Sequence, residues 1–348
     1  MNHYEIRNGR ITFYCPQDFF SKAPKTVGIR GTFTAWRADS NFLLTQIDKT
    51  WTLTKALEQV LVPGNSGLPE FIFYAEFDDG TKETSLPDPR KGFHFLGNTV
   101  IMYDKTVSPN SVSKNEETAL EVRALSSFNL QDEKDRHILA NMRPVPGTTK
   151  LWRGYHPYKK SRPQFDSEDE RLNMVNTLLE EHGIKSVITL SGDEECDPSL
   201  GEKISPYMQN IRSSWNQMIT DTTYETVYFN SGSKEFAQLI ASIVKFINSH
   251  PCPYYIHCRL GSDRTGTTSA TLASLCGASW TDIARDYEKT SLMGIQEFRD
   301  SRLLAYCFNN MLNQEKKSNL KSAVSAHLVN SGCLTQDEIN EVVKRLQS

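Results

Sequence analysis

The sequence predicts two folded parts in one chain: a small all-β, immunoglobulin-like sandwich, followed by a larger α/β domain. Short alternating apolar runs between turn residues occupy the first part, whereas helical apolar spacing alternates with buried strands in the second. The length of 348 residues also suits two domains of ordinary size. We place the sandwich at residues 1–105, a linker at 106–126 and the α/β domain at 127–348.

The sandwich is predicted from alternation and turns. Apolar residues recur at every second position over short runs, and Gly, Pro and Asp separate the runs, which is typical of half-buried strands. The predicted strands are 11–14, 26–30, 51–57 and 71–77, with a turn at 78–81. Residues 106–126 are rich in Ser, Asn and Glu and carry almost no apolar pattern, which is typical of a linker.

The α/β domain is predicted from a change in the spacing of the apolar residues. Leu172, Val175, Leu178 and Leu179 recur at helical spacing, and Gly183 is a natural end for that helix. Alternating strands and helices imply a largely parallel sheet with its site at the carboxyl ends of the strands. The predicted strands are 184–190, 225–229 and 254–256, and the predicted helices are 169–182, 234–248, 267–275, 280–292, 302–312, 320–329 and one that begins with the capping box Thr335 to Glu338.

The composition limits the functions and cellular locations that are expected for this protein. The formal net charge of -3 argues against nucleic-acid binding by bulk electrostatics, and no apolar run is long enough for a transmembrane segment. The first residues lack the apolar core of a signal peptide. Seven scattered cysteines without a Cys-x-x-Cys pair favour a reducing compartment. We therefore expect a cytoplasmic protein, or one delivered into another cell by a dedicated secretion system.

The segment after the predicted strand 254–256 carries residues suited to phosphate chemistry. Cys258 and Arg264 stand at the two ends of a short loop, and a helix of small residues follows. The N–H groups of such a loop and the positive end of the helix favour a bound anion and a cysteine thiolate. A thiolate is a nucleophile, and the planar guanidinium of an arginine matches two phosphate oxygens.

Neighbouring positions suit the same chemistry. Gly261 lets the backbone turn without a Cβ against the anion. Thr265 is placed to hydrogen-bond the sulfur and to ease its departure from a phospho-cysteine. Arg259 adds positive charge, which favours polyanionic substrates or lipid headgroups. The basic run 159–162 is either a further guide for an anionic substrate or a solvated loop.

The pattern His-Cys-x-x-Gly-x-Asp-Arg-Thr-Gly at 257–266 resembles the Cys-x5-Arg superfamily of protein tyrosine and dual-specificity phosphatases, in the form of its atypical, lipid-phosphatase-like bacterial branch. The resemblance implies the Cys-dependent phosphatase fold for 127–348. It also implies hydrolysis of phosphomonoesters through a phospho-cysteine, with no metal or other cofactor. It assigns catalysis to Cys258 and Arg264, and substrate binding to His257, Arg259, Leu260, Gly261, Ser262 and Thr265.

The reaction also needs a proton donor for the leaving oxygen. In standard members an Asp follows the strand before the last helix that precedes the loop, and with 225–229 as that strand the place falls near Ser231. Asp263, within the loop, is the favoured substitute, because this loop Asp is the proposed acid in lipid-phosphatase-like relatives. Glu235 and Asp221 are alternatives, and Asp263 equally suits an ion pair with Arg264 or Arg259.

The sandwich carries a second resemblance. Gly31 to Trp36, Trp51, the turn 77–80, Asp88-Pro89 and Gly97-Asn98 follow one another in an order similar to the family-48 carbohydrate-binding modules. This resemblance implies carbohydrate binding by Trp36, Trp51 and Asn98. A Lys and a Trp usual in that family are replaced here by Ala75 and Lys82, and a strand tryptophan is also typical of a core.

The expected activity is hydrolysis of a phosphorylated protein, as a tyrosine or dual-specificity phosphatase, or of a phosphoinositide. A glucan phosphatase, targeted by the carbohydrate-binding-like sandwich, is an alternative. A pseudophosphatase that binds phosphate and acts as a scaffold is another, since the conventional Asp is absent, although Cys258, Arg264 and Thr265 are all present. In a further alternative, the sandwich only packs on the catalytic domain and shapes its pocket.

Overall fold

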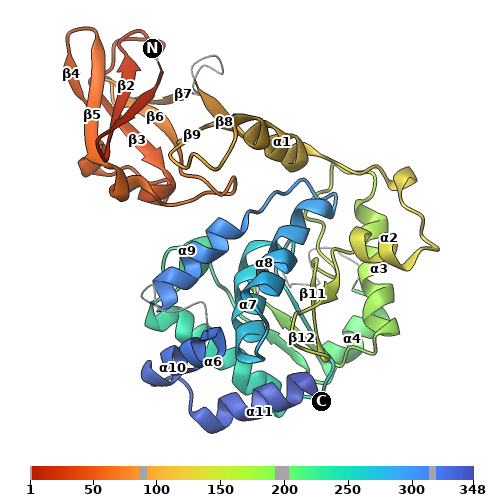
Figure 1. The fold of residues 1–348 in the computed structure, drawn as a ribbon. Coiled ribbons are helices and arrows are strands. Elements are labelled where there is room, and N and C mark those ends of the chain that lie inside the picture. Colours follow the sequence, from red (N-terminus) through yellow and green to blue (C-terminus); the bar gives the residue numbers. More distant parts are fainter. Residues whose placement is uncertain (1, 86–91, 193–203, 313–318) are drawn as a thin grey trace. The chain divides into compact units, whose positions relative to one another are not determined.

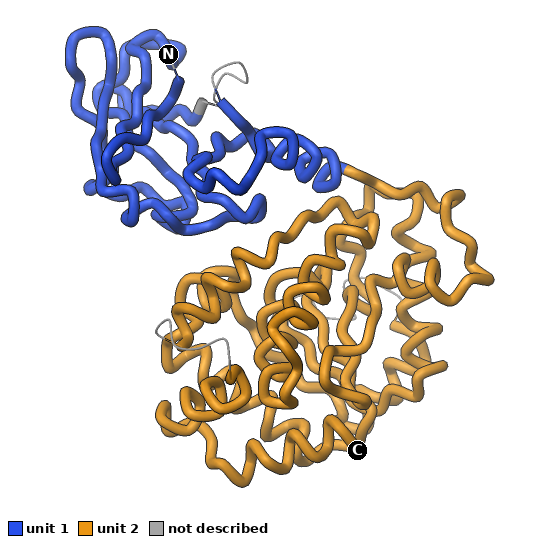
Figure 2. Tube along the Cα trace, viewed as in Figure 1, with its two compact units in different colours: residues 1–120 blue, residues 121–348 orange. Residues whose placement is uncertain are grey.

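The computed structural model describes residues 2–85, 92–192, 204–312 and 319–348 and divides the chain into two compact units, residues 1–120 and 121–348 (Figure 2). Asp88-Pro89 of the carbohydrate-module pattern lies outside the described residues. Each unit has its own hydrophobic core, so each is considered by itself.

The first unit consists of two antiparallel sheets, in which all four predicted strands are found (Figure 1). One sheet has the order β1-β2-β5-β4, and the other has the order β3-β6-β9-β8, with β7 paired to β6. The strands are β1 Tyr4–Arg7, β2 Arg10–Pro16, β3 Thr26–Gly31, β4 Thr45–Ile47, β5 Thr50–Ala56, β6 Glu70–Glu76, β7 Lys82–Ser85, β8 Phe93–Phe95 and β9 Asn98–Val100.

Side chains from both sheets fill one core, as a sandwich requires. Ile11, Phe13 and Cys15 alternate inward along β2 and meet Phe71 and Phe73 of β6 in the same cluster. The helix α1, Pro109–Leu120, lies within the segment predicted as a linker. It packs on β8, and its Glu116 accepts a hydrogen bond from the N–H of Leu96 at 2.7 Å.

The second unit is built on a five-stranded sheet with the order β10-β11-β14-β12-β13. The pairs β11–β14, β14–β12 and β12–β13 are parallel, and only β10 runs antiparallel to its neighbour. The strands are β10 Arg143–Pro144, β11 Leu151–Gly154, β12 Ser186–Thr189, β13 Gln217–Ile219 and β14 Tyr254–His257. The central strand β14 ends at the residue before Cys258, so the candidate loop leaves the middle of the sheet at its carboxyl edge.

Helices cover both faces of this sheet, giving the expected α/β architecture (Figure 1). Tyr254 and Ile256 of β14 point into a core shared with α5 to α11, whereas Tyr255 points into a core shared with α2 to α4. The helices are α2 Glu133–Leu139, α3 Glu168–Glu181, α4 Pro206–Ser213, α5 Tyr224–Tyr228, α6 Lys234–Ser249, α7 Asp263–Leu275, α8 Trp280–Glu288, α9 Ser301–Leu312, α10 Leu320–Asn330 and α11 Gln336–Gln347.

One predicted strand is wrong. Residues 225–229 belong mostly to the short helix α5, whose first turn is capped by the Thr223 side chain accepting from the N–H of Thr226 at 3.1 Å. The edge strand is β13 instead, and its three residues are only half-buried. A short apolar run does not distinguish strand from helix, and an edge strand carries a weak apolar signal, which explains the error.

Candidate active site

The loop 258–264, here called the cysteine loop, joins the end of β14 to the start of α7. Its two motif residues, Cys258 and Arg264, line the same cavity of about 170 Å³. Cys258 is only 3 % exposed, so it lies in the wall of this cavity rather than on the outer surface. The cavity is lined by Ser161, Arg162, Cys258, Arg259, Leu260, Ser262, Asp263 and Arg264.

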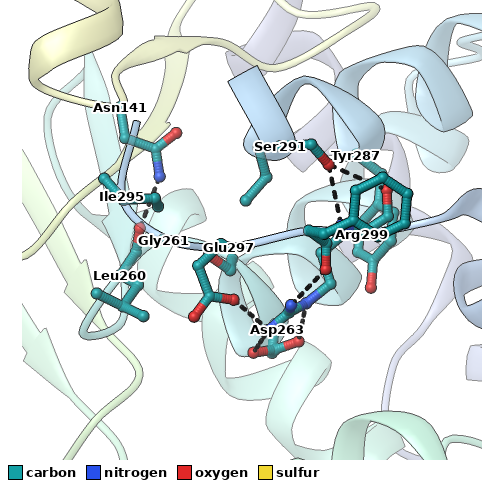
Figure 3. A network of polar contacts seen from close by, with 12 residues as sticks. Asn141, Leu260, Gly261, Asp263, Tyr287, Ser291, Ile295, Glu297 and Arg299 are labelled. Carbon is teal, nitrogen blue, oxygen red and sulfur yellow. Dashed lines mark hydrogen bonds and ion pairs between the residues drawn. The ribbon is translucent and has the colours of Figure 1, made fainter. Parts of the chain in front are cut away.

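The backbone of the cysteine loop turns its carbonyl groups away from the cavity. The carbonyl of Arg259 accepts from the N–H of His156 at 3.0 Å, and the carbonyl of Leu260 accepts from the side chain of Asn141 at 2.6 Å (Figure 3). The N–H groups of Leu260, Gly261 and Ser262 have no acceptor within the described parts of the chain. Such unpaired N–H groups at the start of a helix form an anion site.

Gly261 is required by this backbone. Its φ is +76°, in the left-handed region, and a Cβ at this position would lie 2.3 Å from the carbonyl oxygen of Gly154. Any side chain here would push the loop away from β11. The sequence predicted that a glycine here leaves room for an anion. The structure adds a second reason, which is the close approach of Gly261 to the carbonyl of Gly154.

Arg264 lies across the carboxyl edge of the sheet. Its Nη1 donates weakly to the carbonyls of Leu190 and Thr222, at 3.3 and 3.4 Å. Thr265 is fully buried, and its hydroxyl has no partner among the residues that the structure describes. An unpaired buried hydroxyl beside Arg264 suits the predicted hydrogen bond to the cysteine sulfur.

His257 lies behind the cysteine loop. Its Nε2 shares a hydrogen bond with the Thr189 hydroxyl at 2.9 Å, and Nδ1 lies 3.0 Å from the carbonyl oxygen of Cys258. Complete burial lowers the pKa of His257 to about 4, so the ring is neutral near pH 7. His257 is not part of the cavity lining, and its contacts are those of a residue that positions Cys258.

Asp263 has partners unlike those predicted for it. Arg299 donates to both carboxylate oxygens, through Nε and Nη2, each at 2.7 Å (Figure 3). The Tyr228 hydroxyl donates to the same carboxylate at 2.7 Å. Burial raises the pKa of Asp263, but the Arg299 charge and these hydrogen bonds outweigh it and hold the pKa below its ordinary value. The ion pair is thus with Arg299, not Arg264 or Arg259, and an ionised carboxylate held in this way has no proton to donate.

The corrected strand assignment moves the place of the conventional acid. Asp221 follows β13 by two residues and is exposed. The next residue, Thr222, offers its carbonyl to Arg264, and the backbone of Asp221 forms an isolated bridge with Ser191 after β12. Asp221 therefore lies at the carboxyl edge of the sheet. Glu235, the other alternative, is exposed in the first turn of α6, where it accepts from Thr226 of α5 at 3.5 Å.

The candidate sugar-binding residues of the first unit are not equally available. Trp51 is 8 % exposed and belongs to the core, so its ring faces are covered by other side chains and offer no platform for a sugar. The amide of Asn98 donates to the buried carboxylate of Glu70 at 3.0 Å. Trp36 is half-buried, in a left-handed backbone conformation with φ of 60°.

The sequence analysis assigned no role in the site to the side chains that hold the loop from behind. Asn141, Arg143, Arg153, Asp286 and Arg299 are all at most 7 % exposed and all bond, directly or through one another, to the cysteine loop. Five buried polar side chains on four separate segments have no shared sequence pattern. Their proximity is a product of the fold.

Comparison with known proteins supports the assignment of the second unit. No curated protein matches the chain. Within the described residues, no helix is both long and apolar enough to cross a membrane. Residues 167–332, which contain the whole cysteine loop, match the model of the tyrosine phosphatase family, and this match supports phosphatase activity for the second unit.

Proposed function

We propose that the second unit hydrolyses phosphomonoesters through a phospho-cysteine at Cys258, acting on phosphotyrosine or dual-specificity protein substrates or on phosphoinositides. The observation that carries this proposal is the cysteine loop itself. Cys258 and Arg264 line one small cavity, and the carbonyls between them are tied back. This arrangement provides a nucleophile, a guanidinium and N–H donors around one tetrahedral anion.

The reaction has two steps. The Cys258 thiolate attacks phosphorus, an S–P bond forms and the ester P–O bond breaks, while the leaving oxygen takes a proton from a carboxyl group. A water molecule then gives its proton to that carboxylate and attacks phosphorus, and the S–P bond breaks to release phosphate and the thiolate. Arg264 and the loop N–H groups hold the equatorial oxygens in both steps.

We assign the proton donor to Asp221 rather than Asp263. Asp221 occupies the place after β13, beside the segment that contacts Arg264, and it is exposed. Asp263 is instead fixed by Arg299 as a carboxylate. Under this assignment Asp263 keeps the start of α7 in place, and its replacement affects the loop rather than the proton transfer.

The cavity wall favours a substrate with further negative charge. Arg162 and Arg259 line the cavity together with Arg264. Glu168 accepts from the backbone N–H groups of Ser161 and Arg162 at 2.6 and 2.9 Å and so fixes this part of the basic run 159–162. These basic side chains favour a phosphoinositide within the proposal, with Arg162 already paired to Glu297 at 2.8 Å. The glucan alternative loses support, because Trp51 is in the core and Asn98 is bound to Glu70.

The test is phosphate release by the wild type and by Cys258→Ser on four substrates: a phosphotyrosine peptide, a phosphothreonine peptide, a phosphoinositide and phosphorylated amylopectin. We expect release that disappears in the variant, with the phosphoinositide preferred. Preference for a peptide or for amylopectin would instead select the protein or glucan reading. Absence of release from every substrate, with orthovanadate still bound, would refute hydrolysis and favour a phosphate-binding scaffold.

A further inference from the structure

A buried carboxylate outside the cysteine loop, that of Asp286, forms ion pairs with two neighbouring arginines. Asp286 of α8 accepts from Nε of Arg143 on β10 and from Nη1 of Arg153 on β11, both at 2.7 Å. Through Nη2, Arg153 then donates to the carbonyl of Gly261 at 2.7 Å and, more weakly, to that of Ser262 at 3.4 Å. One side chain thus fixes two consecutive carbonyl groups of the cysteine loop.

A second branch of the same network reaches the preceding carbonyl. Nη1 of Arg143 donates to Oδ1 of Asn141 at 2.6 Å and so orients the amide. The amide nitrogen of Asn141 then donates to the carbonyl of Leu260 at 2.6 Å (Figure 3). From Asp286, the two branches together hold the carbonyls of three successive loop residues. All the side chains involved are nearly inaccessible to water.

The network also places charge behind the loop. Burial lowers the pKa of Arg143 to about 10, so this guanidinium remains charged near pH 7. Burial raises the pKa of Asp286, but the two arginines outweigh it and hold the pKa below its ordinary value. Two guanidinium groups therefore face one carboxylate. Within this network the surplus positive charge is buried directly behind a loop that would receive a dianion.

We propose that Arg153 and Asn141, oriented by Asp286 and Arg143, are positioning residues for the cysteine loop. They turn the carbonyls of three successive loop residues outward so that the N–H groups face the phosphate. This inference rests on the proposed function, in which those N–H groups hold the equatorial oxygens. The four positioning residues touch neither the substrate nor Cys258, and they act only through the loop.

The experiment compares three variants, Arg153→Met, Arg153→Lys and Asn141→Gly, with a matched control. Glycine is chosen at 141 because Asn141 has φ of 46°, so the loss of its amide adds no backbone strain. The control is Arg345→Met, since Arg345 is also partly buried and donates to the Tyr254 hydroxyl at 3.1 Å, on the strand that leads to the loop. Its other bond, to the carbonyl of His250, is likewise remote from the loop.

We expect kcat/KM for 4-nitrophenyl phosphate to fall about 100-fold in Arg153→Met, as for a misplaced reacting group. Asn141→Gly removes one hydrogen bond to a carbonyl, and a loss of about 10-fold is expected. Arg153→Lys should lie between Arg153→Met and the wild type. Orthovanadate affinity should fall in the same order, and Arg345→Met should change neither quantity by more than about 3-fold.

Each result has a defined meaning. Folded variants that keep the wild-type kcat/KM and vanadate affinity would overturn the inference, as would an equal loss in Arg345→Met. If Arg153→Met does not fold, Asn141→Gly and Arg153→Lys decide the question. If the wild type shows no turnover dependent on Cys258, the proposed function fails, while calorimetric binding of orthovanadate still tests the positioning of the loop in the same variants.

Discussion

Both units bury a carboxylate against a loop, and the comparison between them is instructive. In the first unit, Glu70 is 3 % exposed and accepts from the N–H and the hydroxyl of Ser66, at 3.0 and 2.6 Å, and from Asn98 at 3.0 Å. In the second unit, Asp286 accepts from two arginines that bond onward to the cysteine loop.

The difference lies in the donors. The donors that the structure describes around Glu70 are neutral amide and hydroxyl groups, and they fasten a turn of the first unit. Guanidinium groups have several donors each, so Arg143 and Arg153 satisfy Asp286 and still have donors left for the loop. A buried carboxylate thus fastens a turn in one unit, whereas it organises a candidate reaction site in the other. The predictions below test this contrast.

The largest loss of activity is expected when Arg264, which lines the cavity, is replaced. Arg264→Met should reduce kcat/KM by at least about 1000-fold, because the guanidinium that matches the phosphate oxygens is lost. The thermal unfolding temperature should change little, since the hydrogen bonds from Arg264 to the described residues are two long ones, both to carbonyl groups. Steady-state kinetics and a melting curve on the same preparation measure both. Activity near that of the wild type would contradict the role of Arg264.

In the first unit, the largest expected effect is on stability. Trp51→Ala should cost about 3–5 kcal/mol of unfolding free energy, because it empties the core position of a large aromatic ring. Trp36→Ala should cost much less, since Trp36 is only half-buried. Chemical denaturation measures both. Binding of amylopectin by the wild type that Trp36→Ala abolishes would revive the carbohydrate reading with Trp36 as its platform.

Replacing the proposed proton donor, Asp221, should cause an intermediate loss of activity. Asp221→Asn should reduce kcat by about 100-fold for a phosphothreonine peptide, because the alkoxide leaving group needs a proton. The loss should be smaller for 4-nitrophenyl phosphate, whose leaving group is stable as an anion. Glu235→Gln serves as the matched control, since Glu235 is also an exposed carboxylate near the carboxyl edge. Greater dependence on the leaving group in Asp263→Asn than in Asp221→Asn would return the role to Asp263.

The smallest effect is expected at Glu70. Glu70→Gln replaces one acceptor oxygen by a donor among the donors of Ser66 and Asn98, and should destabilise the first unit by about 1–3 kcal/mol. The kcat of the second unit should stay within about 2-fold of the wild type. Denaturation followed by tryptophan fluorescence, together with kinetics, checks both. A large loss of kcat would show that the contrast between the two carboxylates is false.

Much of the fold could be predicted because its signals are local. Alternation identified strands β2, β3, β5 and β6, and helical spacing identified α3, α6 and α9. The predicted capping box at Thr335 is present, with the side chain accepting from the N–H of Glu338. The strand prediction at 225–229 failed where a five-residue run was read without knowledge of its neighbours, and this error also displaced the expected position of the acid.

The sequence by itself determined the cysteine loop and its neighbours in the chain, because Cys258, Gly261, Arg264 and Thr265 lie within one short segment and their chemistry depends on spacing alone. Only the tertiary structure decided what each charge in and around that loop does. Asp263 is held by Arg299, and the loop carbonyls are held by Asn141 and Arg153, residues more than 30 positions away in the chain. Such pairings depend on which strands and helices become adjacent on folding, and a single sequence does not encode them in any local pattern.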